Sequence, residues 1–220
     1  MKRYFITGTD TDCGKTFVTC RLLDYFKENS KSVIGLKPVA SGCYEEGGVV
    51  KSEDEEQIRQ HNGVLIKKNS PWRFKEAISP NFAAALEGKD IKVNEVIDYC
   101  DDVEFSKFDY QLIEGAGGLM VPLSDSLTWI DFLTSIKIPV ILVVGMRLGC
   151  INHALLTDLA LKKNNLACVG WIANCLDNDM QALDDNISIL SQKLSMPLLA
   201  KIKFDGTFID DKCNKLPELF

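Results

Sequence analysis

The stretch GTDTDCGKT, from Gly8 to Thr16, restricts the possible folds of this chain more than any other feature of its 220 residues. It follows a short apolar run and precedes a helical pattern, which is the strand–loop–helix order of a phosphate-binding loop. The usual motif is G-x-x-x-x-G-K-[ST], whereas here five residues separate Gly8 from Gly14. We predict a nucleotide site with a lengthened loop; the alternative is a glycine-rich turn that carries a solvated lysine.

Each part of such a loop has a chemical role. Its glycines let backbone N–H groups face the phosphates, and the helix that follows adds the positive end of its dipole. Lys15 then reaches the β- and γ-phosphates, and the Thr16 hydroxyl holds Mg²⁺. The predicted nucleotide-binding residues of the loop are Asp12, Cys13, Gly14, Lys15, Thr16 and Phe17.

Short apolar runs alternate with longer helical patterns along the chain. The predicted strands are Arg3–Thr7, Val33–Val39, Tyr110–Glu114, Pro139–Gly145, Val169–Asn174 and Pro197–Ile202. The predicted helices are Lys15–Asn29, Asp54–Asn62, Val93–Val103, Trp129–Ser135, Asn152–Asn164 and Met180–Leu194. Continuously apolar strands in this order predict one α/β domain over residues 1–220, a P-loop NTPase-like fold with a mainly parallel sheet flanked by helices. The pattern is weakest over Lys67–Gly88, which contains two prolines.

Composition and charge exclude several classes of protein. The net charge of −6, without clustered Lys and Arg, argues against binding to a nucleic-acid backbone. The eight cysteines form no CxxC pair and there are only two histidines, so a zinc site is not expected. The longest apolar run, Ile138–Gly145, is far shorter than the ~20 residues of a membrane helix. We therefore expect a cytoplasmic protein with reduced thiols and no membrane partner.

Polar residues gather at the predicted carboxyl ends of the strands, where ligands bind in such folds. Lys37 ends a buried strand, a position that favours contact with an anion; the alternative is a lysine that reaches solvent. Glu114 ends another apolar strand and is the expected second ligand of Mg²⁺. Asp54 lies in SEDEEQ, which suits either a metal ligand or a solvated helix start.

Two glycine-containing segments also fall at this edge. The GAGG stretch at Gly115–Gly118 allows close backbone approach to an anion, or forms a plain tight turn. The GCIN stretch at Gly149–Asn152 precedes an apolar helix. Asn152 is therefore either an N-cap or part of a group of free N–H donors that hold a carboxylate.

Together these motifs give the chain a family resemblance. It resembles the dethiobiotin synthetases, the ATP-dependent carboxylases of biotin biosynthesis, in GTDTDCGKT, KPVASG, the acidic Asp54, IEGAGG with PLSD after it, PVILVVG followed by LGCINHA, and GWIAN. The motifs stand in family order and spacing over Arg3–Asn174, about three quarters of the chain. Lys67–Val103 and the tail after Lys201 look divergent.

The resemblance implies a homodimer that converts 7,8-diaminononanoate, CO₂ (or bicarbonate) and ATP into dethiobiotin, ADP and phosphate, with Mg²⁺ as cofactor. In the implied mechanism one amine forms a carbamate with CO₂, and the carbamate oxygen attacks the γ-phosphate to give a carbamic–phosphoric anhydride. The second amine then closes the cyclic urea and expels phosphate. Catalysis consists of positioning and charge neutralisation.

The resemblance also implies roles for individual residues. Lys15, Lys37 and Thr11 are the implied catalytic residues, with Lys15 neutralising the γ-phosphate and the carbamate. The implied metal ligands are Thr16, Asp54 and Glu114. Glu114, Gly117 and Asn174 would add to the nucleotide site, Asn174 by recognising the adenine edge. The substrate would contact Thr11, Lys37, Ser41, Gly117 and Gly118, while N–H groups of Cys150, Ile151 and Asn152 of the partner subunit would bind its carboxylate.

One departure from the family concerns the nucleotide base. The family usually continues the strand at Pro197–Ile202 into a proline and a segment that cradles the base, whereas this chain has Lys203 there and a short tail. We expect weakened adenine contacts and looser discrimination among nucleoside triphosphates.

Two other classes of protein share this fold. A dimerising switch ATPase of the partition or targeting type usually begins its loop K-G-G-x-G-K-T, but Gly8 here follows Thr7, not lysine. A cobyrinate-type amide ligase normally carries an additional glutaminase domain, for which 220 residues leave no room. Fold alone does not exclude the switch ATPase, so it remains the alternative function.

Overall fold

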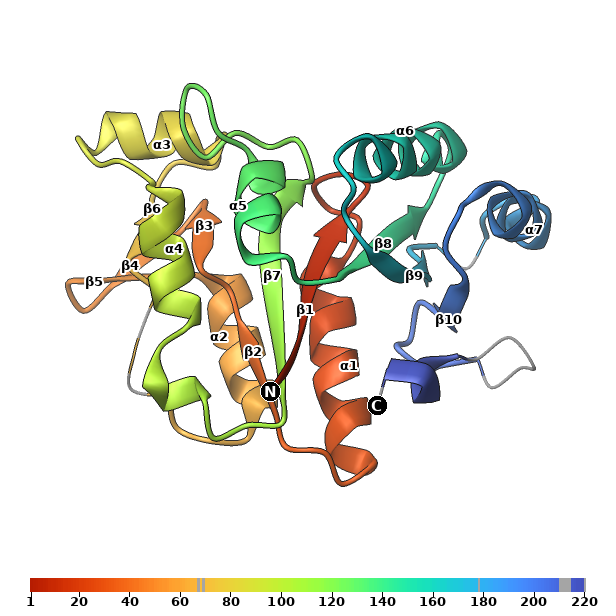
Figure 1. Cartoon of the computed structure of the whole chain (residues 1–220), viewed down its shortest axis with the longest axis horizontal. Helices are drawn as coiled ribbons and strands as arrows, with labels where there is room; N and C mark the ends of the chain where they lie inside the picture. Colours follow the sequence, from red (N-terminus) through yellow and green to blue (C-terminus); the bar gives the residue numbers. More distant parts are fainter. Residues whose placement is uncertain (67, 69, 178, 210–214, 220) are drawn as a thin grey trace.

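The computed structural model describes residues 1–66, 68, 70–177, 179–209 and 215–219. Six parallel strands form the central sheet, in the order β10-β9-β8-β1-β7-β2 (Figure 1). The bounds of these strands are β1 (Lys2–Gly8), β2 (Val33–Leu36), β7 (Tyr110–Gly118), β8 (Val140–Met146), β9 (Cys168–Cys175) and β10 (Leu198–Ile202). The predicted α/β class with a mainly parallel sheet is confirmed.

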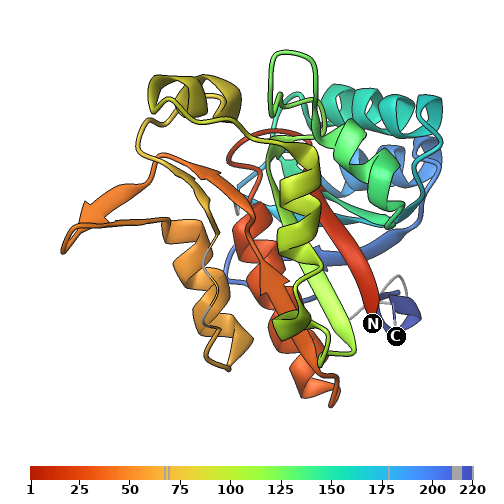
Figure 2. The ribbon, with the colours of Figure 1, turned by 60° about the vertical axis from the view of Figure 1, so that its left-hand side comes forward.

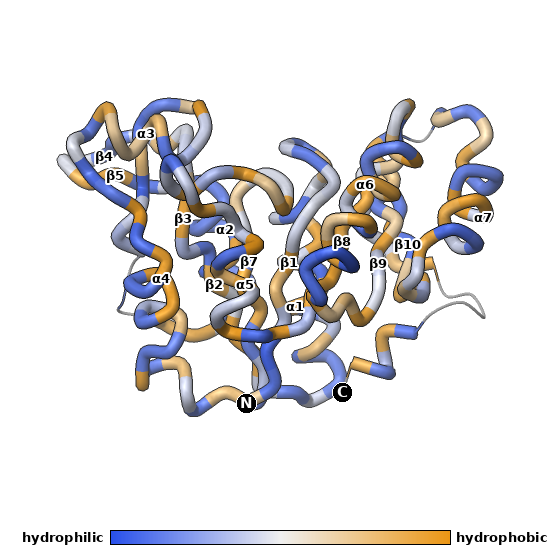
Figure 3. Tube along the Cα trace, turned by 45° about the horizontal axis from the view of Figure 1, so that its top comes forward, coloured by the Kyte–Doolittle hydropathy of each residue, from blue (hydrophilic) through white to orange (hydrophobic). Residues whose placement is uncertain are grey.

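Helices cover the sheet on both faces. Their bounds are α1 (Lys15–Glu28), α2 (Glu53–Asn62), α3 (Pro80–Leu86), α4 (Val93–Cys100), α5 (Trp129–Ile136), α6 (Cys150–Lys163) and α7 (Leu183–Lys193), with 3₁₀ turns η1 (Val103–Phe105) and η2 (Leu216–Leu219). In Figure 3, α4, α6 and α7 carry both hydrophobic and hydrophilic stretches, as helices with one buried face do. None of the helices in the described ranges is long and apolar enough to cross a bilayer.

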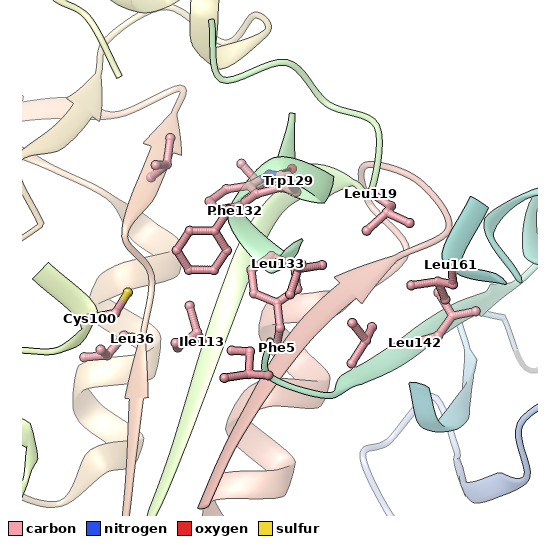
Figure 4. Close-up of a cluster of buried hydrophobic side chains, with 14 of the residues drawn as sticks. Phe5, Leu36, Cys100, Ile113, Leu119, Trp129, Phe132, Leu133, Leu142 and Leu161 are labelled. Atoms are coloured by element: carbon pink, nitrogen blue, oxygen red, sulfur yellow. Dashed lines mark hydrogen bonds between the residues drawn. The ribbon is translucent and has the colours of Figure 1, made fainter. Parts of the chain in front are cut away.

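The core consists of two layers, one on each face of the sheet. Successive residues of β1 alternate between them, because side chains of a strand point to opposite faces. Phe5 lies in the layer under α4 to α7, while Tyr4 and Ile6 lie in the layer under α1 and α2. The ring of Phe5 packs against Trp129 and Phe132 of α5, with centroids 5.2 and 5.7 Å apart (Figure 4). Full burial of such side chains contributes about 1.5–3 kcal/mol each.

The predicted strand Val33–Val39 is wrong as a single element. The main sheet keeps only β2, and the chain leaves it at Lys37 and Pro38. Proline has no N–H for a strand ladder, which explains the break. Residues Val39–Ser41 then form β3 and pair with β6 (Trp72–Phe74) in a separate two-stranded sheet.

Other elements differ from the prediction mainly in poorly patterned segments. A hairpin of β4 (Tyr44–Glu46) and β5 (Val49–Lys51) turns through two glycines with positive φ and extends away from the body of the protein (Figure 2). Strand β6 and helix α3 lie inside the weakly patterned Lys67–Gly88. The predicted helix Val93–Val103 ends at Cys100, and the predicted Met180–Leu194 begins at Leu183. Helix α6 begins two residues before the predicted start, so its N-cap is Gly149, at φ 93°, and not Asn152.

Candidate functional site

A cavity of about 820 Å³ opens at the carboxyl ends of β1, β3 and β7. Its walls come from the glycine loop, the segment after Lys37, the start of α2, residues 77–80 and the end of β7. The predicted site residues that line it are Thr11, Asp12, Gly14, Lys15, Thr16, Phe17, Lys37, Ser41, Asp54 and Gly117. Residues far apart in the sequence therefore meet at the sheet edge where ligands of this fold class bind.

The glycine loop wraps the amino end of α1. Gly14 is the N-cap residue, with a left-handed φ of 83°, and a Cβ there would lie 2.0 Å from Nδ2 of Asn174. Glycine is therefore required at this position by both conformation and space. The ammonium of Lys15 turns back on the loop and donates to the main-chain oxygen of Asp10 at 2.9 Å. Within the described ranges no carboxylate is hydrogen-bonded to this ammonium, so the buried cation is suited to an incoming anion.

Lys37 lies between two carboxylates behind the loop. Its Nζ is 2.6 Å from Oε1 of Glu114 and 2.9 Å from Oδ2 of Asp54. Burial alone would lower the pKa of Lys37, but the charges of Glu114 and Asp54 outweigh it and raise that pKa above its usual value. Burial would likewise raise the pKa of Asp54, yet Lys37 holds it below its usual range. The lysine is therefore charged, and it meets anions as expected.

Glu114 is the anchor of this arrangement. Its side chain is fully buried and accepts from Thr16 at 2.7 Å, from Lys37 at 2.6 Å and from Thr19 at 2.7 Å. Three donors fix the orientation of this buried carboxylate. Through these contacts Glu114 connects β7 to α1 and to Lys37, the residue after β2. We call Glu114, Thr16 and Lys37 the floor of the site.

The donor set fits a hard divalent cation. Thr16 and Asp54 line the cavity, and Glu114 lies behind Thr16, within hydrogen-bond distance of it. Hydroxyl and carboxylate oxygens of this kind suit Mg²⁺. Within the described ranges no group of three His, Cys, Asp or Glu side chains could hold a metal. A magnesium ion here would need further oxygens from a substrate phosphate and from water, as is usual for nucleotide-bound magnesium.

Other predicted residues lie outside the cavity wall. Cys13 is buried, and its main-chain oxygen accepts from Nδ2 of Asn174 at 3.0 Å; the Oδ1 of Asn174 is buried without a hydrogen-bond partner in the described structure. Gly118 lies beside the main chain of Gly8, with 3.4 Å between its Cβ position and the Gly8 oxygen. The stretch Cys150–Asn152 forms the first turn of α6 and does not line the cavity of its own chain.

Several residues in or next to the cavity were not predicted from the sequence. Ser52 caps α2 by accepting from the Glu55 N–H at 3.3 Å, and the S-x-x-E spacing was a usable signal for this start. Thr19 follows Thr16 by one helical turn, a spacing that could have placed it near Glu114. Residues 77–80 belong to the weakly patterned segment, whose sequence does not indicate that they reach the cavity.

Comparisons with known proteins identify the family. The chain matches the family described as an AAA domain over residues 2–208. It is 51% identical over 211 residues to the ATP-dependent dethiobiotin synthetase of Legionella pneumophila strain Lens, covering 96% of this chain and 97% of that protein. The chain belongs to the dethiobiotin synthetases. The namesake from Cellvibrio japonicus is 40% identical over 203 residues, 91% of this chain and 89% of the relative.

Membership in the dethiobiotin synthetases makes the chain an enzyme of the ligase class. The similarity to the Legionella protein extends well beyond Arg3–Asn174 and so includes most of the segments that look divergent. It therefore reaches further along the chain than the motifs alone indicate.

Solved structures support the P-loop fold. MinD from Pyrococcus horikoshii, in complex with Mg-ADP, has a TM-score of 0.56 and 19% identity, covering 93% of this chain and 82% of that one. FtsY, the signal recognition particle receptor from Elizabethkingia anophelis, has a TM-score of 0.57 and 16% identity, covering 99% of this chain and 65% of that one. At these identities the likeness concerns the fold alone, so it gives the switch ATPase alternative no support beyond the fold.

Proposed function

We propose that this dethiobiotin synthetase joins 7,8-diaminononanoate and CO₂ at the expense of ATP, through a carbamate and a carbamic–phosphoric anhydride. The observation that carries the proposal is that Lys15 and Lys37 line the same cavity, together with Thr11 and Ser41. One part of this cavity suits triphosphate and the other a small amine substrate. The names of the relatives support the ATP dependence and the product.

The chain's residues act on charge and position in each step. An amine loses a proton and adds to CO₂, giving a carbamate whose oxygen attacks the γ-phosphorus while ADP leaves. Lys15 neutralises the charge that builds up on the transferred phosphoryl group, and Lys37 steadies the carbamate. Thr11 and Ser41 hold the diamine, so that its second amine attacks the carbonyl carbon, loses a proton and expels phosphate. No covalent bond to the protein is needed.

Thr16, Asp54 and Glu114 are the proposed ligands of Mg²⁺. The ion would neutralise phosphate charge during transfer. Lys37 already bridges the same two carboxylates, so the floor is held in place before nucleotide binds. MinD, on a similar fold, binds its nucleotide as Mg-ADP.

The active site is proposed to be shared between two copies of the chain. The first turn of α6 does not line its own cavity, although Cys150, Ile151 and Asn152 are the proposed carboxylate site. Helix α6 also leaves Leu156 and Leu159 more than half exposed, at 57% and 62%. A second copy packed on this face would bury them and bring its own helix end to the cavity. Sedimentation at twice the chain mass would support this dimer, and a monomer under assay conditions would contradict it.

We expect the adenine base of the nucleotide to be bound weakly. The unpaired Oδ1 of Asn174 is suited to an exocyclic amino group, a donor that adenine and cytosine both carry. Residues 203–209 instead turn back over α1, where Arg21 donates to the Gly206 oxygen at 3.0 Å beside Phe17. We therefore expect kcat/KM for CTP to lie within about tenfold of that for ATP, a difference of about 1.4 kcal/mol. A strong ATP preference with a tight KM would contradict this expectation.

The activity is tested by phosphate release. With Mg-ATP and bicarbonate, 7,8-diaminononanoate should stimulate release strongly, because the γ-phosphoryl group has no acceptor until the carbamate forms. Phosphate release that is the same with and without the diamine would refute the proposed function and favour a switch ATPase.

The described cysteines are all free thiols, which supports the proposed cytoplasmic location.

A further inference from the structure

A cross-link joins the glycine loop to the segment that precedes α6. Arg147 donates from Nη2 to Oδ2 of Asp10 at 2.6 Å, and the same nitrogen lies 3.5 Å from the main-chain oxygen of Thr11. Arg147 follows β8 and stands two residues before Gly149, the N-cap of α6. This ion pair therefore joins the glycine loop to the segment that leads into α6.

Asp10 is the centre of the contacts in this part of the loop. Its Oδ1 accepts from the N–H of Thr11 at 2.8 Å, and its main-chain oxygen accepts from the ammonium of Lys15 at 2.9 Å. One residue thus orients both the backbone of Thr11 and the cation of Lys15. Thr11 and Asp12 are exposed, so packing does little to fix this turn. From outside the loop, Arg147 contacts Asp10 and Thr11, while Asn174 donates further along the loop to the Cys13 oxygen.

We propose that Arg147 is a positioning residue of the reaction: through Asp10 it fixes Thr11 and Lys15 toward the cavity and links them to the start of α6. The proposal rests on the proposed function, in which Thr11 holds the diamine and Lys15 meets the γ-phosphate. An exposed ion pair adds little to global stability, and both side chains here are about 40–50% exposed. Its loss should therefore appear in turnover and not in unfolding.

The test compares variants that break the ion pair alone. Asp10→Asn keeps the acceptor for Thr11 and the main-chain oxygen for Lys15 but removes the charge, while Arg147→Gln removes the other partner. Each should lower kcat about tenfold, because small misplacement of reacting groups slows catalysis strongly. The double variant should be no slower than the slower single one, since the two act as a unit. Arg147→Lys should recover part of the rate.

A matched control removes a similar ion pair elsewhere. Asp101→Asn breaks the pair with Arg3, which has the same 2.6 Å separation and a similarly exposed carboxylate, at the amino end of β1. It should leave kcat within about twofold of wild type, and all variants should unfold within about 2 °C of it. Rates for Arg147→Gln and Asp10→Asn that match Asp101→Asn, or losses that multiply in the double variant, would overturn the proposal.

Amide hydrogen exchange separates this proposal from the proposed function. Exchange across residues 9–13 should be faster in Arg147→Gln and Asp10→Asn than in wild type and Asp101→Asn, with or without substrates. Unchanged exchange would overturn the proposed positioning role even in an active enzyme. A wild-type protein that makes no dethiobiotin would refute the proposed function, and exchange would still decide whether Arg147 holds the loop.

Discussion

Replacing Lys37 with methionine is expected to destabilise the protein and to stop turnover. The substitution leaves the fully buried carboxylate of Glu114 without its cation, and Thr16 and Thr19 remain as its donors in the described part of the chain. Breaking one side of a buried ion pair costs about 3–5 kcal/mol, and the two threonines place the expected loss near the lower end. That corresponds to a fall in the unfolding midpoint of about 6–12 °C for a chain of this size. Thermal unfolding measures the first effect, and phosphate release with the diamine measures the second.

Two further variants separate burial from charge. Lys51→Met removes a cation that also contacts two carboxylates, those of Glu46 and Glu56, but at the surface. It should lower the unfolding midpoint much less than Lys37→Met does, because solvent screens an exposed ion pair. Lys37→Met combined with Glu114→Gln removes both charges and should recover stability but not turnover. If Lys37→Met unfolds at the same temperature as Lys51→Met, the buried pair does not hold the floor of the site.

Replacing Lys15 with alanine is expected to give the opposite pattern, with stability kept and catalysis lost. Its hydrogen bond goes to a main-chain oxygen, so removing the side chain leaves no buried carboxylate unpaired. The change in unfolding free energy should be under about 1 kcal/mol. Turnover should fall by about 10²–10³-fold or more, the usual effect of deleting one group that stabilises transition-state charge. Steady-state kcat and thermal unfolding of the same preparation give both numbers.

Two other results for Lys15→Ala would each change the role given to this lysine. Near-normal kcat in Lys15→Ala would remove Lys15 from the mechanism. A large loss of stability would mean that the lysine supports the ligand-free loop structurally, in which case the kinetic loss could not be assigned to phosphate transfer.

The central sheet follows from the sequence because its strands are buried on both faces. Five of the predicted strands, from Arg3–Thr7 to Pro197–Ile202, need only local changes of boundary. The glycine loop is equally predictable, since the spacing of Gly14, Lys15 and Thr16 fixes how α1 begins. Strong local patterns therefore determine most of the fold.

The arrangement around Lys37 is harder to predict because it depends on long-range contacts. The motif KPVASG is compatible with one continuous strand, and only the pairing of β3 with β6 shows that the chain turns at Pro38. Residues 77–80 reach the cavity through tertiary packing of a segment without a clear pattern. The roles of the individual site residues remain predictions.

Oxygen transfer from CO₂ to phosphate tests the central claim most directly. The enzyme would be given C¹⁸O₂, Mg-ATP and 7,8-diaminononanoate in a short reaction, and the released phosphate analysed by mass spectrometry. If the carbamate oxygen attacks the γ-phosphorus and phosphate is later expelled from the anhydride, each phosphate released with dethiobiotin should carry one ¹⁸O. Dethiobiotin accompanied by unlabelled phosphate, while the CO₂ pool is still labelled, would contradict this mechanism.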